Sequence, residues 1–103
     1  MHQATLTATF ADAAFPAVMG PNMAIMIMWF WNQVHRSPGK VEVGPVQLDK
    51  LKVRLDNGNL LMPMTITTAG DETKLASAFQ DWWNEQSGLA AGLRITACTA
   101  ILD

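Results

Sequence analysis

Hydrophobic and polar residues alternate over residues 3–10 of the chain. One set of positions holds the apolar residues Ala4, Leu6, Ala8 and Phe10, and the other holds Gln3, Thr5, Thr7 and Thr9. A period of two residues predicts a β-strand with one buried face, and threonine is common in such strands. Because a strand near a chain end is ordered only when it is paired, we expect it to lie in a sheet.

The dipeptide Asn57-Gly58 separates two alternating stretches, residues 51–55 and 59–67, and predicts a β-hairpin. Asn-Gly favours a type I′ turn, in which both central residues need a positive φ. With a two-residue turn, the expected apolar pairs are Leu55 with Leu60, Val53 with Met62 and Leu51 with Met64. Pro63 lies on the other face and cannot donate a ladder hydrogen bond, so it indicates an edge or a bulge.

Residues 71–86 show apolar residues at helical spacing. The stripe consists of Leu75, Ala78, Phe79 and Trp82. Asp71 suits the N-cap and Gly88 the position after the C-cap, so both ends of a helix are marked. The alternation returns over residues 93–102 and predicts a last strand.

Residues 23–31 are nine consecutive apolar residues that end in three aromatics. Periodicity cannot distinguish a buried strand from a buried helix in such a run. The methionines and Asn22, a possible N-cap, favour a helix. The isoleucines and the Trp-Phe-Trp triplet favour a strand, and we interpret the run as a strand that is buried on both faces.

The expected elements combine into a single α+β domain over residues 1–103. Pro16 and Gly20-Pro21-Asn22 indicate a loop over residues 11–22, and a short strand is expected at 40–43. We predict a small, mostly antiparallel sheet, or a sandwich or roll, of about five to six strands. One amphipathic helix, at residues 71–86, is expected to pack on it.

The composition favours association and argues against nucleic acid as the main partner. Charged residues make up 16% of the chain and the net charge is −2, whereas about 25% charged residues is typical of soluble domains. Few like charges keep copies apart, and no overall positive field attracts phosphate. The basic residues Lys40, Lys50, Lys52 and Arg54 are interpreted as solvated side chains of the hairpin region.

The sequence also suggests a compartment. The residues after Met1 lack the basic and apolar regions of a signal peptide, and the apolar run at 23–31 is much shorter than the ~20 residues of a membrane span. Cys98 is the single cysteine, which fits a reducing environment. We expect a soluble protein in the cytoplasm, or part of a particle assembled there, with no membrane partner.

Candidate residues for chemistry are few. His2 and His35 have no partner at zinc-ligand spacing, and no glycine-rich phosphate loop occurs, so we expect no catalytic residue, metal or cofactor. Cys98 lies between small residues of a predicted strand and is interpreted as a core residue. Whether the protein is an enzyme stays open, and the sparse set of titratable groups favours a protein that is not.

Three functional hypotheses remain, and the first two follow from a surplus of apolar residues over what one small core can bury. The first is a non-enzymatic assembly subunit that associates with copies of itself, or with another assembly protein, as a ring, tube or virion/tail-type component. Its expected interface residues are Phe15, Val18, Met19, Met26, Met28, Phe30 and Trp83. The second is a small-molecule binder or small enzyme with an apolar pocket rimmed by Trp29, Trp31, His35 and Trp82. The third, a nucleic-acid-binding module, has the weakest support.

Overall fold

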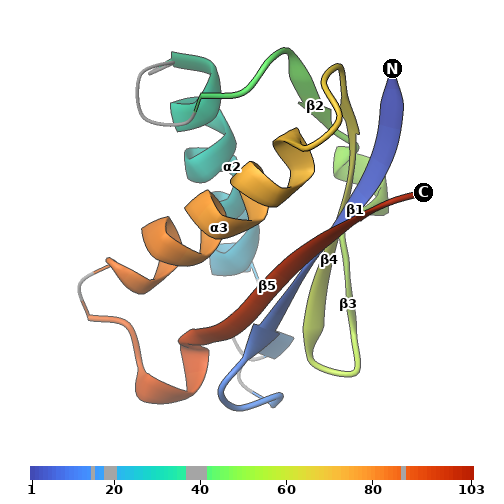
Figure 1. Ribbon diagram of the computed structural model, residues 1–103. Helices are drawn as coiled ribbons and strands as arrows, with labels where there is room; N and C mark the ends of the chain where they lie inside the picture. The colour runs from blue at the N-terminus through green and yellow to red at the C-terminus, as the bar shows by residue number, and fades with distance from the viewer. Residues whose placement is uncertain (15, 18–20, 37–41, 87) are drawn as a thin grey trace.

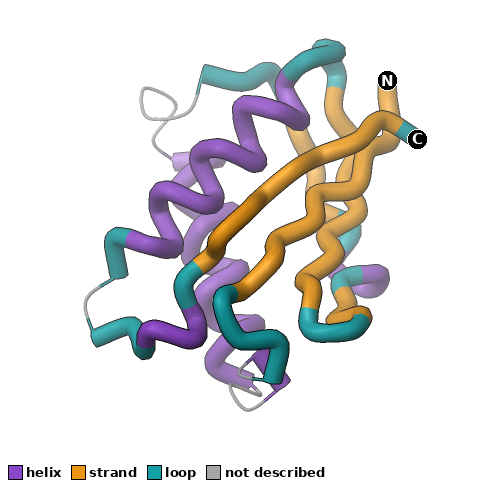
Figure 2. The backbone as a smooth tube through the Cα atoms, turned by 60° about the horizontal axis from the view of Figure 1, so that its bottom comes forward, coloured by secondary structure: helices purple, strands orange, loops and turns teal. Residues whose placement is uncertain are grey.

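The computed structural model describes residues 1–14, 16–17, 21–36, 42–86 and 88–103. Within them the chain forms a five-stranded antiparallel sheet with two α-helices on one face (Figures 1 and 2), which confirms the predicted α+β class. The elements are β1 (His2–Phe10), α2 (Pro21–Arg36), β2 (Val46–Leu48), η1 (Lys50–Lys52), β3 (Arg54–Asp56), β4 (Asn59–Ile66), α3 (Asp71–Asn84), η2 (Ala91–Leu93) and β5 (Ile95–Leu102). The strand order is β2-β4-β1-β5, and β3 also pairs with β4.

Strand β1 is one of the interior strands of the sheet. It pairs with β4 on one side and with β5 on the other, both antiparallel. The predicted alternation is confirmed, because Ala4, Leu6, Ala8 and Phe10 are all buried beneath the helices and Thr5, Thr7 and Thr9 are half-buried on the outer face. Neither α2 nor α3 covers that outer face (Figure 2).

The predicted hairpin is confirmed at its turn. Asn57 and Gly58 have φ values of 52° and 81°, and Leu55 lies opposite Leu60. The expected pair of Leu51 with Met64 is wrong, because Leu51 lies in η1 and is 97% exposed. Leu48 of β2 takes the place opposite Met64 instead.

Pro63 explains why the hairpin pairing stops early. Strands β2 and β3 pair with the same side of β4, at residues 64–66 and 59–61, and they leave a gap opposite Met62 and Pro63. The carbonyl of Pro63 accepts a hydrogen bond from the Asp49 N–H at 2.9 Å, so the backbone groups of Pro63 face this gap. Because proline has no N–H, a continuous partner strand would lose a bond there. The predicted edge or bulge is therefore an interruption along one side of β4.

The interpretation of residues 23–31 as a strand is wrong, because they lie in helix α2. Its buried side chains follow a spacing of three and four residues: Met23, Ile27, Phe30, Trp31 and Val34. Pro21 is the first residue of the helix, a position that proline favours because its missing N–H has no partner there in any case. The sheet is wide enough for α2 and α3 together on its inner face (Figure 1).

Helix α3 confirms the one predicted helix, with a different N-terminus. Gly70, at a φ of 102°, is the N-cap residue, and the predicted Asp71 N-cap is wrong. The Asp71 carboxylate instead accepts the N–H of Gly44 at 2.8 Å, and the Glu72 carboxylate accepts the N–H of Gly70 at 2.8 Å. Of the strand expected at 40–43, residues 40 and 41 lie outside the described residues, and Glu42 and Val43 are loop.

An aromatic cluster joins the two helices to the sheet. Phe30 of α2 packs edge-on against Phe79 of α3, with ring centroids 5.0 Å apart. Trp83 contacts Phe79 and Phe10 at centroid distances of 5.7 and 5.5 Å, and its indole N–H donates to the Leu93 carbonyl at 2.8 Å. Trp83 therefore fixes the end of α3 to β1 and to η2.

Candidate functional site

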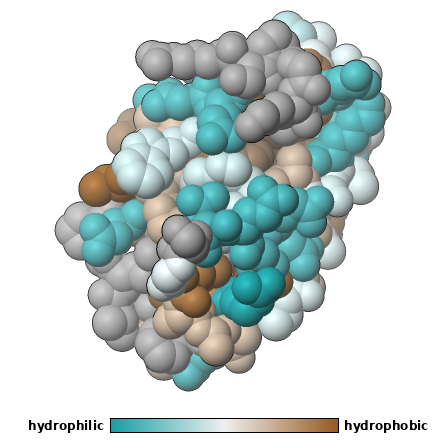
Figure 3. Space-filling model, turned by 90° about the vertical axis from the view of Figure 1, so that its left-hand side faces the viewer, coloured by the Kyte–Doolittle hydropathy of each residue, from teal (hydrophilic) through white to brown (hydrophobic). Residues whose placement is uncertain are grey.

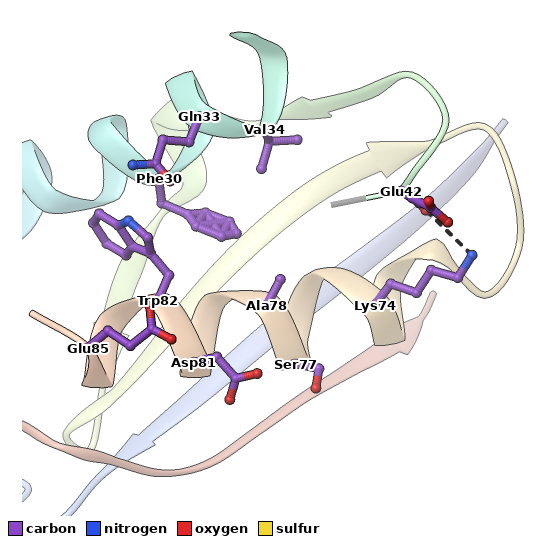
Figure 4. A pocket seen from close by; sticks show the side chains of 10 residues that line it. All are labelled: Phe30, Gln33, Val34, Glu42, Lys74, Ser77, Ala78, Asp81, Trp82 and Glu85. Atoms are coloured by element: carbon purple, nitrogen blue, oxygen red, sulfur yellow. Dashed lines mark hydrogen bonds between the residues drawn. The ribbon is translucent and has the colours of Figure 1, made fainter. Parts of the chain in front are cut away.

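The larger groove lies between α2 and α3 and has an apolar floor (Figure 4). It has a volume of about 560 Å³. Phe30 and Trp82 point toward one another across it, with ring centroids 5.7 Å apart. The other lining residues are Gln33, Val34, Glu42, Lys74, Ser77, Ala78, Asp81 and Glu85. Such an aromatic floor can hold a flat apolar group.

The rim of this α2–α3 groove is acidic. Glu42, Asp81 and Glu85 contribute three carboxylates against the single amine of Lys74. Lys74 Nζ donates to the Glu42 carbonyl at 3.5 Å and lies 4.0 Å from the Asp71 carboxylate, so its charge is partly compensated. The electrostatics of the groove therefore suit a cationic or neutral ligand better than an anionic one.

A smaller groove of about 360 Å³ separates the first half of α2 from β3. Its walls are apolar side chains: Met23, Ala24, Ile27, Met28, Val53, Leu55 and Leu60. Lys50 and Arg54 supply its charge, which is positive. The two grooves thus lie on opposite sides of α2, and the charges that line them differ in sign.

The solvent side of α2 is unusually apolar. Ile25 is 48% exposed and Trp29 is 58% exposed, although they are among the largest apolar side chains of the helix. They lie one turn apart on the same side, and the half-buried Met28 continues this side to the smaller groove. We refer to Ile25, Met28 and Trp29 as the α2 outer surface. On the side of the molecule that Figure 3 shows, hydrophilic residues separate smaller hydrophobic areas.

The structure distributes the expected interface residues over the core and the surface. Phe30 and Trp83 belong to the core, at 2% and 0% exposure, and Met26 is half-buried against it. Met28 lies on the α2 outer surface. Phe15, Val18 and Met19 lie outside the described residues. Sequence reasoning missed Ile25 as an exposed position, and a helical interpretation of residues 23–34 would have found it.

The expected pocket rim is not assembled from all its members. Trp82 lines the α2–α3 groove, whereas Trp29 is exposed on the solvent side of α2 and is not among the residues that line the groove. Trp31 is in the core, and its indole N–H has no acceptor among the described residues. His35 is in α2, but its side chain is not among the parts of the chain that the structure describes.

Cys98 lies on the inner face of β5, opposite Ala8 of β1. Burial raises the pKa of its thiol from 9.0 to about 12. The thiol therefore keeps its proton at neutral pH, and a protonated thiol is a poor nucleophile.

We expect Cys98 to lower the folding stability as the pH rises above 9. Between pH 9 and about 12 the unfolded chain releases the thiol proton and the folded chain keeps it, because the folded pKa is the higher one. Ionisation then stabilises the unfolded state, whereas below pH 9 it has no effect. Urea unfolding of the wild type and of Cys98→Ala, at pH values on both sides of 9, measures this difference. A difference that does not change with pH would contradict the prediction.

The remaining features give no evidence of a reaction. No group of three or more histidine, cysteine or acidic residues in the described ranges is arranged to hold a metal ion. Of the basic residues near the hairpin, Lys50 and Lys52 lie in η1 and Arg54 lies in β3. The Lys52 amine is 3.6 Å from the Asp49 carboxylate. Lys40 lies outside the described residues. None of the helices in the described part of the chain combines the length and the apolarity that crossing a membrane requires.

Comparison of the chain with family models, with curated proteins and with solved structures finds no match.

Proposed function

We propose that this chain is a non-enzymatic assembly subunit that associates with copies of itself through apolar surfaces. A ring, a tube or a virion/tail-type particle is the kind of structure that such a subunit would build. The single observation that carries the proposal is the α2 outer surface, where an isoleucine and a tryptophan one helical turn apart face solvent.

The chemistry of this surface is that of an interface centre. Tryptophan is enriched at binding hot spots because it buries a large area with little loss of conformational freedom. Burying apolar surface stabilises an association by roughly 25 cal/mol per Å². The low net charge of −2 opposes the contact of two copies only weakly. Exposed Leu55, at the wall of the adjoining smaller groove, extends the same apolar region.

We expect the double substitution Ile25→Gln and Trp29→Gln to reduce the size of the assembly while the subunit stays folded. Both side chains are largely exposed, so the core loses little when they change. Size-exclusion chromatography with light scattering gives the mass at micromolar concentration, and circular dichroism checks the fold. Leu51→Gln is the control, because it removes an exposed leucine from η1, outside the α2 outer surface. A wild type that is a single monomeric species would overturn the proposal.

A small-molecule binder is the second candidate, and the α2–α3 groove favours it. The aromatic floor and the acidic rim together fit a ligand with an aromatic ring and an amine. Phenethylamine is a suitable probe, since it carries only these two groups. Saturable NMR shifts of the Ala78 methyl, which also lines the groove, that Trp82→Leu abolishes would support this candidate, and shifts that rise linearly with concentration would count against it.

A further inference from the structure

Strand β5 is an edge strand without the protection that edges usually carry. It is the last strand in the order β2-β4-β1-β5, and among the described elements only β1 pairs with it. Residues 96–102, Thr-Ala-Cys-Thr-Ala-Ile-Leu, contain no charged residue, glycine or proline. Natural edges are generally blocked by lysine, proline or a covering element, because unpaired backbone groups bind other strands. An edge of this kind is suited to extending the sheet.

The backbone groups that face outward can be assigned from one hydrogen bond. The N–H of Asp103 donates to the Gln3 carbonyl at 2.8 Å, so Asp103 and Gln3 form a hydrogen-bonded pair. Such pairs alternate along an antiparallel ladder. Thr99 and Ile101 therefore direct their backbone groups to β1, and the groups of Cys98, Ala100 and Leu102 point to the open edge.

Helix α3 marks where the open edge begins. The side-chain amide of Asn84 pairs with both backbone groups of Ile95: its oxygen accepts the Ile95 N–H at 2.8 Å, and its nitrogen donates to the Ile95 carbonyl at 3.0 Å. The backbone N–H and carbonyl of Ile95 are thereby both hydrogen-bonded, and the open edge runs from Thr96 to Leu102. Its central residue is Thr99. Two copies that pair over the whole open edge in antiparallel orientation place their two-fold axis at Thr99.

The charges at the two ends of the strand select the antiparallel orientation. Arg94 precedes β5 and Asp103 follows it, and both are exposed. Antiparallel pairing brings Arg94 of each subunit to the end that carries the partner subunit's Asp103. Parallel pairing would instead bring like charges together at both ends, which is unfavourable. The ends of β5 are thus complementary to a second copy of the same strand.

The side of α3 that reaches this edge carries a row of polar, uncharged side chains. Gln80 and Asn84 both contact Ile95, and one and two turns earlier on the same side come Ser77 and Thr73. All four side chains are polar and uncharged. If two subunits continue one sheet, their α3 helices come to lie on the same face, and Asp81, one turn after Ser77, is the charged residue next to this row of polar side chains.

We propose that β5 pairs with β5 of a second copy, antiparallel about a two-fold axis at Thr99, so that the sheets of two subunits become continuous. This interface rests on the proposed function as an assembly subunit and names one of its contacts. A two-fold contact alone stops at a dimer. With the α2 outer surface as a second contact on the same subunit, assembly can continue beyond the dimer.

Substituting Thr99 by cysteine tests the axis directly. In a Cys98→Ala background, the two thiols that Thr99→Cys introduces would lie opposite each other in a non-hydrogen-bonded pair, with Cα atoms about 4.5 Å apart, which a disulfide can span. Thr7→Cys in the same background is the control, since Thr7 is the β1 neighbour of Thr99 on the same face. Because β1 lies one strand further from the axis in each subunit, the Cα atoms of the two Thr7→Cys residues would be about 14 Å apart, three strand spacings. We expect oxidation to convert most of Thr99→Cys, and little of Thr7→Cys, into a covalent dimer.

A charge at the axis provides a test that needs no oxidation. Thr99→Lys places two lysines opposite each other, whereas Ile101→Lys, on the same strand and face, meets Ala97 of the partner subunit. Thr99 and Ile101 are both exposed, so the folded subunit tolerates either change. We expect Thr99→Lys to raise the dissociation constant at least about tenfold more than Ile101→Lys, because like charges directly opposite are destabilising.

The outcomes separate this interface from the proposed function. An oligomer by light scattering in which Thr99→Cys does not cross-link above the Thr7→Cys level would overturn the β5 interface and leave the assembly function standing. A wild type that is monomeric at all concentrations would overturn both. Cross-linking of Thr99→Cys that an excess of a peptide of residues 94–103, carrying Cys98→Ala, does not suppress would show that the β5 edges do not form the contact and would also overturn the interface.

Discussion

Replacing Trp83 by alanine is expected to lower the free energy of unfolding by about 3–5 kcal/mol, the loss typical of a buried tryptophan. Trp83 has no exposed surface and packs against Phe10 and Phe79. Its indole N–H donates to the Leu93 carbonyl at 2.8 Å, so the substitution also leaves that carbonyl without its donor. The cavity would lie where α3 meets β1, in a region that cannot collapse without moving both.

Urea unfolding followed by circular dichroism, at one protein concentration, measures this loss. Trp82→Ala is the matched control, since Trp82 is the neighbouring tryptophan on the same helix and faces the α2–α3 groove. We expect the control to lose less than half as much. Trp83→Phe keeps most of the ring packing and removes the hydrogen bond, which contributes about 1 kcal/mol. Equal losses for Trp82→Ala and Trp83→Ala would show that Trp83 does not hold the core together.

Gly58→Ala is expected to destabilise the protein by about 2–5 kcal/mol for two separate reasons. The φ of Gly58 is +81°, a conformation that costs a residue with a Cβ roughly 1–2 kcal/mol. A Cβ there would also lie 2.6 Å from the Ala13 carbonyl oxygen and 2.5 Å from the Ala13 Cβ. Because Ala13 presents backbone atoms, it can move away only if the segment after β1 shifts, and such overpacking costs about 1–3 kcal/mol.

Gly88→Ala separates the two contributions to this loss. Gly88 has almost the same φ, +77°, and among the described residues no atom lies within 4 Å of the Cβ that alanine would add. Its substitution should therefore cost only the conformational part. Urea unfolding of both variants gives the difference, which measures the contact between the hairpin turn and Ala13. Equal losses at the two glycines would mean that the segment after β1 adapts freely.

Local patterns predicted the strands and the helix whose two faces differ in polarity. Thr5 and Leu6 reveal the faces of β1 because one face is buried and the other meets water. Asn57-Gly58 predicted the turn, since few other dipeptides accept two positive φ values. Phe79 and Trp82 predicted α3 by their helical spacing. In each case the residues themselves carry the preference.

The same reasoning failed where the environment is apolar on both sides. Ile25 and Ile27 give residues 23–31 no polar face, so the period that distinguishes a helix from a strand is absent. Leu51 continues the alternation of the hairpin, but Pro63 on β4 ends the pairing before Leu51 is reached. The sequence contains Pro63, but whether proline faces a partner strand or a gap depends on which strands lie beside it.

The candidate surfaces divide in the same way. A surplus of apolar residues was evident from the sequence, and it predicted association. Of the expected interface residues, Met28 lies on the α2 outer surface, whereas Phe30 and Trp83 are buried in the core. Ile25 and Trp29, which were not expected there, are exposed. Which members of an apolar run face solvent depends on the phase of the helix against the sheet.

By itself, then, the sequence determined the α+β class, the two faces of β1, the Asn57-Gly58 turn and the position of α3, because these depend on preferences between neighbouring residues. Only the tertiary structure decided that residues 23–31 form a helix and that β5 is an open edge of the sheet. It also decided that the side chain of Asn84 hydrogen-bonds to the backbone of Ile95, the first residue of β5. These depend on contacts between segments far apart in the chain, such as Asn84 with Ile95 and β1 with β5. No local pattern specifies which segment will be the neighbour.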